Sequence, residues 1–172
     1  LYDRIKNDLS DILLTKDNKV LNELMDAMKL LQQADNLGSI MKFDISEVTR
    51  EIIVRRLAEY KTMGEMPIMI RNFLSAFRLI LALTDKYAAV VANPPYMGAS
   101  NMNAELATYA KDYYFNGKSD LFAVFMYVSM KLLVPKGKTG MINMQSWMFL
   151  SSFEKLRKYF IMNYHIDNML HL

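Results

Sequence analysis

The chain has 172 residues, of which 52% are hydrophobic and 23% are charged, and its formal net charge is +3. This composition is typical of a globular domain with a core and excludes a disordered chain. The chain has no cysteine and two histidines, which excludes disulfides, thiolate metal sites and a cysteine nucleophile and argues against a histidine-based triad. The small positive charge permits nucleic acid as a partner without arguing for it.

The sequence predicts neither a membrane nor a secreted protein. The longest apolar stretch, "LFAVFMYVSMKLLV", is interrupted by Lys131 and is too short to span a bilayer. The mixed, polar opening "LYDRIKNDLSD" does not resemble a signal peptide. We therefore expect a cytoplasmic protein with no membrane partner. Because the chain begins with Leu1 and not Met, we also expect an excerpt from something longer.

The chain before Asp85 is predicted to be helical. Apolar residues recur at helical spacing over about 18–34, Ser46 is placed to cap a second helix, and Pro67 suits the first turn of a third. The stretch "SIMKF" between the first two helices indicates a short strand. The residues expected inside these helices are Leu21, Leu24, Met25, Met28 and Leu31 in the first, Val48, Ile52, Leu57 and Tyr60 in the second, and Phe73, Phe77, Ile80 and Leu81 in the third.

Beyond Asp85 the pattern changes. The stretch "AAVVA" has the unbroken apolar character of a strand that is buried on both faces. A polar and aromatic loop follows, in which a short helix is expected over about 104–113. A strong helix, "DLFAVFMYVSMKLL", then begins at Ser119 or Asp120 and stops before Pro135.

The last part of the chain repeats this alternation. "PKGKTG" is predicted as a tight turn and "MINMQ" as a second buried strand. Ser151 and Glu154 form a capping-box pattern for a helix to about Met162, and "HIDNMLHL" is predicted as a third strand. Alternating strands and helices imply a parallel sheet with right-handed crossovers. The fold class is therefore α/β, with about three parallel strands in a partial Rossmann-like arrangement that follows a helical segment.

The stretch "NPPY" after the first predicted strand carries the chemistry. In open α/β sheets ligands bind just beyond the carboxyl ends of strands, where Asn93 is expected to lie. The Asn93 side chain and the Pro94 carbonyl are acceptors, and the pair of prolines, Pro94 and Pro95, holds this backbone extended. Two fixed acceptors suit a planar NH2 group, and Tyr96 offers a flat face for stacking on a ring. Accepting both protons favours a more tetrahedral nitrogen, whose lone pair then points toward an electrophile.

The chain resembles class I S-adenosylmethionine-dependent amino-methyltransferases, chiefly N6-adenine DNA methyltransferases. "VVANPPYMG" and "KSDLFAVFMYVSMKLLVPKGKTGMINMQSWMF" are most similar to the large single-chain bacterial enzymes of BREX-type phage defence and of type IIG restriction-modification. The upstream "QQADNLGSIMKF" resembles the helical insert of those enzymes. The resemblance implies that Asn93 and the Pro94 carbonyl hold the target amine, that Pro95 shapes the loop, and that Tyr96 stacks on a flipped adenine. It further implies double-stranded DNA as the partner of the intact parent protein.

The methyl-donor site of this family has no counterpart in the sequence. The family binds S-adenosylmethionine with a glycine-rich loop after its first strand, yet no two of the six glycines form G-x-G, and "GKTG" lies between a helix and a strand. No cofactor-binding residue is therefore assigned. We expect residues 1–85 to be a helical insert or packing segment and residues 86–172 to be the catalytic-loop half of the domain, without the cofactor-loop half. Alone, this chain is expected to be inactive.

Several further residues have two interpretations. Asp120 is placed to contact substrate or donor, but an acidic residue in a first helical turn ordinarily complements the helix dipole. Gly98 is small enough to allow close backbone approach. Four aromatic residues are equally suited to a base pocket and to packing of a loop helix: Tyr109, Tyr113, Tyr114 and Phe115.

Charged residues give weaker signals. His165, Asp167 and His171 share one face of the third predicted strand but lack a further ligand, so no metal site is predicted. Two basic clusters are suited to phosphate but are typical of solvated helix faces, and the arginines are expected on the outer side of their helix. These clusters are Arg50, Arg55 and Arg56, and Lys155, Arg157 and Lys158.

Alternatives to a DNA methyltransferase remain open. The same chemistry serves methylation of a glutamine in a protein or of a base in RNA, although a helical segment of about 80 residues is unusual for a compact protein methylase. A second alternative is a non-catalytic helical interaction module. The sheet edge that missing strands should cover predicts a homodimer or poor solubility of this chain.

Overall fold

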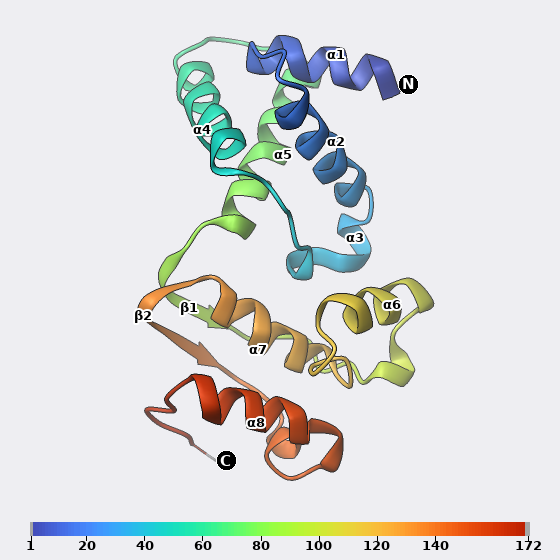
Figure 1. The fold of residues 1–172 in the computed structure, drawn as a ribbon, viewed down its shortest axis with the longest axis vertical. Coiled ribbons are helices and arrows are strands. Elements are labelled where there is room, and N and C mark those ends of the chain that lie inside the picture. The colour runs from blue at the N-terminus through green and yellow to red at the C-terminus, as the bar shows by residue number, and fades with distance from the viewer. Residues whose placement is uncertain (1, 171–172) are drawn as a thin grey trace. The chain divides into compact units, whose positions relative to one another are not determined.

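The structure is a computed structural model that describes residues 2–170 (Figure 1). The chain divides into two compact units between Asp85 and Lys86. Within the described residues there are eight α-helices and one sheet of two parallel strands. The mixed α/β class is confirmed, and the fold agrees with part of a methyltransferase domain. The expected third strand is not formed there.

Unit 1 is helical. Its helices α1 and α2 pack together, and α4 packs on both of them and on α5 (Figure 1). Their bounds are α1 Tyr2–Leu13, α2 Asn18–Leu31, α3 Ala34–Leu37, α4 Glu47–Lys61 and α5 Ile68–Thr84. The largest fully buried side chains in this unit are Leu9, Leu13, Val20, Leu24, Ile40, Ile53, Leu74, Phe77 and Ile80.

The predicted start of α4 is confirmed, and of the residues predicted inside this helix Tyr60 is buried, Ile52 and Leu57 are partly buried and Val48 is exposed. Ser46 caps the helix, and its hydroxyl accepts from the Thr49 N–H. Val48 is 55% exposed, and the stripe that faces the core is Thr49, Ile53, Arg56 and Tyr60. The carboxylate of Glu23 on α2 explains why Thr49 faces the core while Val48 does not. It accepts hydrogen bonds from Ser46 and Thr49 and so holds the polar start of α4 inward.

Arg56 contradicts the expectation that the arginines of α4 lie outside. Its side chain is 6% exposed, and its Nε donates to the Ile12 carbonyl at 2.7 Å. Its guanidinium also bonds Glu59 and lies 4.8 Å from the centre of the Tyr60 ring. A buried charge is tolerated here because its donors have partners. The "SIMKF" strand is also wrong, since Gly38–Ile40 is a 3-10 turn followed by irregular chain.

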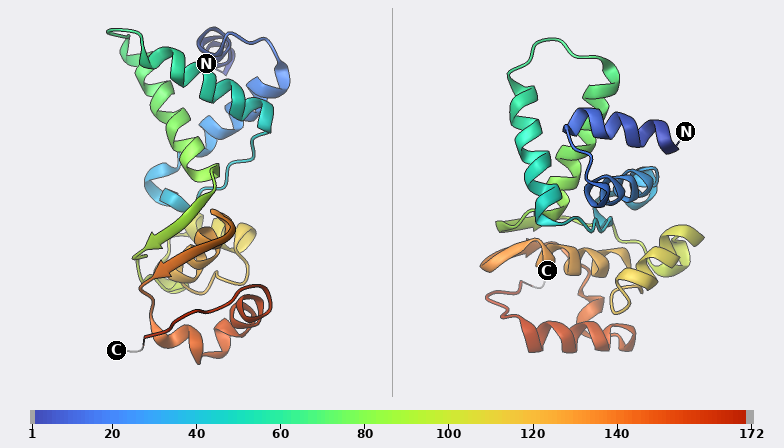
Figure 2. Two further views of the ribbon diagram at one scale, coloured as in Figure 1. Left: turned by 90° about the vertical axis from the view of Figure 1, so that its left-hand side faces the viewer. Right: turned by 45° about the horizontal axis from the view of Figure 1, so that its top comes forward.

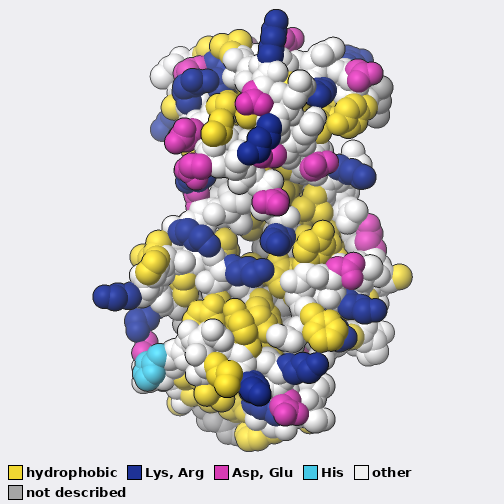
Figure 3. Space-filling model, viewed as in Figure 1, with side chains coloured by type: hydrophobic (Ala, Val, Ile, Leu, Met, Phe, Trp, Pro, Cys, Tyr) yellow, Lys and Arg dark blue, Asp and Glu magenta, His cyan; other side chains and the backbone are white. Residues whose placement is uncertain are grey.

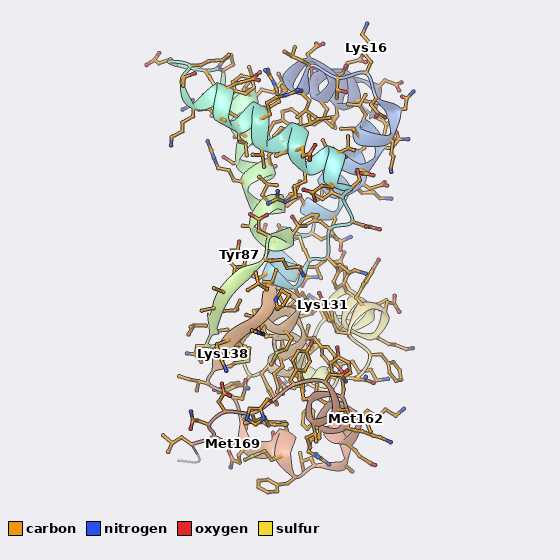
Figure 4. All side chains as sticks on the ribbon, turned by 60° about the vertical axis from the view of Figure 1, so that its left-hand side comes forward. Lys16, Tyr87, Lys131, Lys138, Met162 and Met169 are labelled. Carbon is orange, nitrogen blue, oxygen red and sulfur yellow. The ribbon has the colours of Figure 1, made fainter. Side chains whose placement is uncertain are left out.

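Unit 2 contains the sheet. Strands β1 and β2 run parallel, joined through helices α6 and α7, and α7 packs on both strands (Figure 2). Ala89 pairs with Lys138 and Val91 with Gly140. Tyr87, labelled in Figure 4, begins β1 and donates its N–H to the Leu132 carbonyl at 2.7 Å. The bounds are β1 Tyr87–Ala92, α6 Ala104–Tyr113, α7 Leu121–Lys131, β2 Leu133–Met141 and α8 Glu154–Asn163.

The second strand lies earlier in the chain than predicted. β2 includes the "PKGKTG" stretch, whereas "MINMQ" contributes only Met141. The turn signal corresponds to an irregularity, because the register shifts between Tyr87 and Ala89 and Lys136 has a φ of 66°. Residues 165–170 of the third predicted strand are irregular, and residues 171 and 172 lie outside the described part.

The sheet is buried on one face only, which corrects the expectation of two buried faces. Exposure alternates along β2 and beyond it: Gly140 and Ile142 are exposed while Met141 and Asn143 are partly buried. On β1, Val91 is 84% exposed and pairs with Gly140. Helix α7 packs on both strands, and the described residues of unit 2 leave Val91 on the other face exposed.

Candidate functional site

The "NPPY" loop begins where β1 ends, as predicted. Asn93 directly follows Ala92, the last residue of the strand, and its side chain is exposed. Pro94 is buried and Pro95 is exposed, which continues the alternation of the strand. Within residues 2–170, neither the Asn93 side chain nor the Pro94 carbonyl accepts a hydrogen bond from another residue. Two adjacent acceptors at a strand end therefore keep their hydrogen-bonding capacity within the described residues, and the Asn93 side chain is the exposed one of the two.

Tyr96 is held at its hydroxyl and open along its ring. The hydroxyl donates to the Ile142 carbonyl at 3.2 Å, and the Ile142 N–H donates to the Ala92 carbonyl at 3.2 Å, so the ends of β1 and β2 and the loop are joined. The ring meets Phe122 of α7 edge to face, with 6.2 Å between ring centres. Tyr96 remains 48% exposed, which leaves surface for a stacking partner.

A carboxylate fixes the chain that follows Tyr96. Asp120 Oδ1 accepts from the Met97 N–H at 3.0 Å and from the Phe122 N–H at 3.2 Å. The second bond makes Asp120 the N-cap of α7, in agreement with the helix-start interpretation. The bond from the Met97 N–H to Asp120 is not predicted by the sequence, because no sequence pattern indicates a contact between residues 97 and 120.

Within the chain, the closest approach is made at Gly117. A Cβ at Gly98 would lie 3.8 Å from Asp120 Oδ2, an ordinary contact, so packing of the chain itself does not require glycine there. A Cβ at Gly117 would lie 2.9 Å from the Ala123 carbonyl oxygen and 3.0 Å from the Val124 nitrogen. The loop before α7 therefore touches the helix backbone directly.

The four aromatic residues of the loop divide into two pairs. Tyr109 and Tyr114 are buried, and burial raises the pKa of Tyr114 well above its ordinary value. Tyr113 and Phe115 are 49% and 51% exposed. The Nζ atoms of Lys118 and Lys155 lie 4.0 and 5.3 Å from the centre of the Phe115 ring. The burial of Tyr109 and Tyr114 favours the packing interpretation for these two residues, while the rings of Tyr113 and Phe115 reach the surface.

Several of the charged residues considered as candidate ligands or phosphate contacts bond other parts of the chain. Lys138, labelled in Figure 4, bonds Asp167 and thereby lowers the pKa of that carboxyl group. His165 lies 3.7 Å from Asp167, and His171 lies outside the described residues. In the described range no group of three or more His, Asp or Glu side chains is placed to hold a metal ion. Of the basic clusters, Arg50 bonds Asp85 and Arg157 donates to the carbonyls of Trp147 and Leu150.

Two further observations concern the surface of the protein and the length of its apolar helices. On the face shown in Figure 3, charged side chains of both signs and hydrophobic side chains lie at the surface of both units, and the hydrophobic areas are widest over unit 2. No helix in the part of the chain that the structure describes is long and apolar enough to cross a membrane.

No described loop fits the methyl donor. The loops that follow β1 and β2 begin with Asn93 and Ile142, and neither contains the paired glycines of a donor loop. The one described glycine with positive φ is Gly38, which follows α3 in the helical unit rather than a strand. The described loops therefore do not fit the methyl donor that the resemblance implies.

Comparison with known proteins places the chain in a family. Residues 3–172 match the model of the Eco57I restriction-modification methylases. The chain is 38% identical over 156 residues to the adenine-specific methyltransferase BrxX of Escherichia coli O9:H4 (strain HS), covering 87% of this chain and 13% of that protein. It is 32% identical over 174 residues to the adenine-specific methyltransferase PglX of Lacticaseibacillus casei (strain Zhang), covering 96% and 14%.

A third relative is shorter. The type II methyltransferase M.VspI of Vibrio sp. (strain 343) is 32% identical over 120 residues, which cover 70% of this chain and 28% of that protein. The chain thus spans between 13% and 28% of the length of the curated relatives that it matches. Because the family model covers nearly the whole chain, the protein belongs to the Eco57I restriction-modification methylase family.

Proposed function

We propose that this chain is the amine-holding part of an adenine-specific DNA methyltransferase that acts in restriction-modification or phage defence. The observation that carries the proposal is the pair of open acceptors, the Asn93 side chain and the Pro94 carbonyl, at the end of a parallel strand beside the half-exposed Tyr96 ring. The names of the relatives, adenine-specific methyltransferases and a type II methyltransferase, support adenine as the base.

The two acceptors have a defined task in this proposal. The amine of adenine is a poor nucleophile because its lone pair is delocalised into the ring. When Asn93 and the Pro94 carbonyl each accept one of its protons, the nitrogen becomes more tetrahedral and its lone pair leaves the plane of the ring. The donor would supply the methyl carbon as its bond to the sulfonium sulfur breaks and would leave as a neutral thioether. The methylated nitrogen would then release one of those protons to water, so no histidine is needed as a base before the attack.

Tyr96 and Pro95 complete the acceptor site. An adenine inside a duplex cannot reach Asn93, so the base leaves the stack before it binds. The exposed ring of Tyr96 then replaces the stacking that the base loses when it leaves the duplex. Pro95 restricts the backbone between Pro94 and Tyr96 to one conformation. Double-stranded DNA is thus the proposed partner of the full-length protein, in the cytoplasm.

S-adenosylmethionine is the proposed methyl donor, since it supplies the electrophilic methyl group in the family that the chain resembles. No described loop fits it, so the proposal assigns no step on the donor to these residues. Residues 1–85 are proposed as a helical insert or packing segment and residues 86–172 as the catalytic-loop half of the domain. The 172-residue chain alone is expected to transfer no methyl group.

Two other functions make different predictions. A methylase that acts on protein glutamine or on RNA would use the same acceptors, because the target is again a planar NH2 group. A helical interaction module would leave Asn93 and Tyr96 without a task. The two open acceptors disfavour the module, and the adenine-specific names of the relatives disfavour glutamine.

The test uses the full-length gene product that contains this chain. The protein is incubated with methyl-labelled S-adenosylmethionine and unmodified DNA, and the DNA is digested to nucleosides. We expect label in N6-methyladenine, and a loss of about 10²-fold or more in rate for Asn93→Ala because an electrostatic contact to the reacting group is removed. Asn101→Ala is the matched control, since Asn101 is an exposed asparagine of the same loop. Label in RNA or protein, or an Asn93→Ala variant as active as the control, would overturn the proposal.

A further inference from the structure

We propose that Asp120 is a positioning residue that holds the "NPPY" loop against α7, so that the Asn93 and Pro94 acceptors and the Tyr96 ring meet the target base together. This inference rests on the proposed function. It concerns a residue that contacts neither acceptor and whose sequence context indicates only a helix cap. Hydrogen bonds and ring contacts within unit 2 carry it.

The first contact is a shared oxygen. Asp120 Oδ1 accepts from the Met97 N–H at 3.0 Å and from the Phe122 N–H at 3.2 Å. Met97 directly follows Tyr96, and Phe122 lies in the first turn of α7. One carboxylate oxygen therefore joins the end of the loop to the start of the helix. Both bonds are charge-assisted, and the helix N-terminus favours the negative charge.

The backbone on both sides strengthens this junction. The Leu121 N–H donates to the Met97 carbonyl at 2.9 Å, and the Ala99 N–H donates to the Ser119 carbonyl at 3.0 Å. Gly98 and Asp120 form an antiparallel bridge. We call residues 97–99 and 119–122 the loop–helix junction. Within the described structure, the Asp120 side chain accepts hydrogen bonds from both segments of this junction, from Met97 in the first and from Phe122 in the second.

The junction also sets the orientation of the Tyr96 ring. The N–H of Phe122 is bound by Asp120, and the Phe122 ring meets Tyr96 edge to face at 86°. Phe122 is completely buried and packs on Phe153, with 5.5 Å between ring centres. Because Phe122 cannot move freely, a shift of the first turn of α7 would tilt the stacking ring.

The two tasks of Asp120, capping and positioning, can be separated by substitution. Serine caps a helix nearly as well as aspartate, but its single short hydroxyl does not reach two N–H donors in the way the carboxylate does. Asparagine keeps an Oδ1 acceptor of the same reach. We therefore expect Asp120→Ser to retain the helix and release the loop, and Asp120→Asn to retain both.

The experiment measures kcat and KM for DNA, together with the melting temperature, in the full-length protein. We expect Asp120→Ser to lower kcat by about 10- to 10²-fold, as for a reacting group displaced by about 1 Å, with KM for DNA and melting temperature near those of the wild type. Asp120→Asn is expected within a few-fold of wild-type kcat. Asp112→Ala, a change of an exposed aspartate on α6, is the control.

The outcomes separate this inference from the proposed function. An Asp120→Ser variant with wild-type kcat, in an assay where Asn93→Ala is inactive, would overturn the positioning role and leave the proposed function intact. A loss of kcat in Asp120→Ser that only follows a lowered melting temperature would also overturn it. Full activity of Asn93→Ala would overturn both.

Discussion

In the loop after β1, the residues that fix the backbone in place are not the residues that keep free hydrogen-bond acceptors. The Tyr96 hydroxyl is bound by the Ile142 carbonyl and the Met97 N–H by Asp120, so these groups are used by the fold. Asn93 and the Pro94 carbonyl are bound by no other residue in the described range. This division lets the loop stay fixed while it offers two acceptors to a ligand.

Gly117 gives a prediction at the same scale. Its replacement by alanine places a Cβ 2.9 Å from the Ala123 carbonyl oxygen, which belongs to the backbone of α7 and cannot rotate away. We expect Gly117→Ala to lower the free energy of unfolding by about 1–3 kcal/mol, the usual range for overpacking. Chemical denaturation measures the change.

The control for this prediction is Gly64→Ala. A Cβ at Gly64 would have no atom within 4 Å, and its φ is not positive. This variant is expected to be as stable as the wild type or slightly more stable, since alanine reduces the freedom of the unfolded chain. Equal denaturation midpoints for the Gly117 and Gly64 variants would contradict the close approach of the loop to α7.

Helices α6 and α7 could be predicted from sequence because their signals are local. Asn103 accepts from the Leu106 N–H at the start of α6, and Asp120 does the same for Phe122 at the start of α7. Both are caps that read directly from residue type. The "NPPY" position at a strand end could also be predicted, because "AAVVA" is apolar and the prolines end it.

The strand β2 could not be predicted in this way. Its residues include Pro135 and Gly137, which locally indicate a turn, and pairing with β1 is decided by residues far away in the chain. The same limit applies to Arg56, whose burial depends on the Ile12 carbonyl of another helix. In the site, the bond from Met97 to Asp120 had no sequence signal for the same reason.

The contact between α2 and α4 predicts a dependence of stability on pH. Partial burial raises the pKa of Glu23, but hydrogen bonds from Thr49 and Ser46 outweigh it and lower the pKa below its ordinary value of 4.5. The stabilisation from this carboxylate is therefore present above that value and is lost as the pH falls through the lower pKa of the folded state. Glu23→Gln is expected to reduce the free energy of unfolding at pH 7 by about 1–2 kcal/mol.

This effect is measured by denaturation at several pH values. The difference between the wild type and Glu23→Gln should narrow as the pH falls below 4.5, the ordinary pKa of the group. Glu51→Gln, a change of an exposed residue on α4, is the control and should behave as the wild type at every pH. A difference that stays constant from neutral to acid pH would show that the charge of Glu23 does not matter.

At the scale of the whole chain, the free edge of β1 and the apolar side chains exposed near it favour self-association. Val91 is 84% and Ile142 is 65% exposed, and among residues 2–170 β1 has a strand neighbour on one side only. An uncovered edge with apolar residues pairs readily with another copy. We expect the 172-residue chain to form dimers or larger species, and Val91→Lys to shift it toward the monomer in light scattering.

Val48→Lys is the matched control for this prediction. Val48 is a valine of unit 1 that is 55% exposed on a helix, where no strand edge is available. Its replacement should leave the size distribution unchanged. A 172-residue chain that is already monomeric at every concentration would contradict the open edge.

The parallel pairing of β1 and β2 has a consequence for the order of folding. Helices α6 and α7 lie between the two strands in the chain, so the strands meet only after a long segment has closed. Loop closure lowers chain entropy before any pairing is gained, which makes such contacts slow to form. Helical hairpins such as α1 and α2 need far less closure. We therefore expect the helices to form early and the strand end that carries Asn93 to acquire its geometry among the last events of folding.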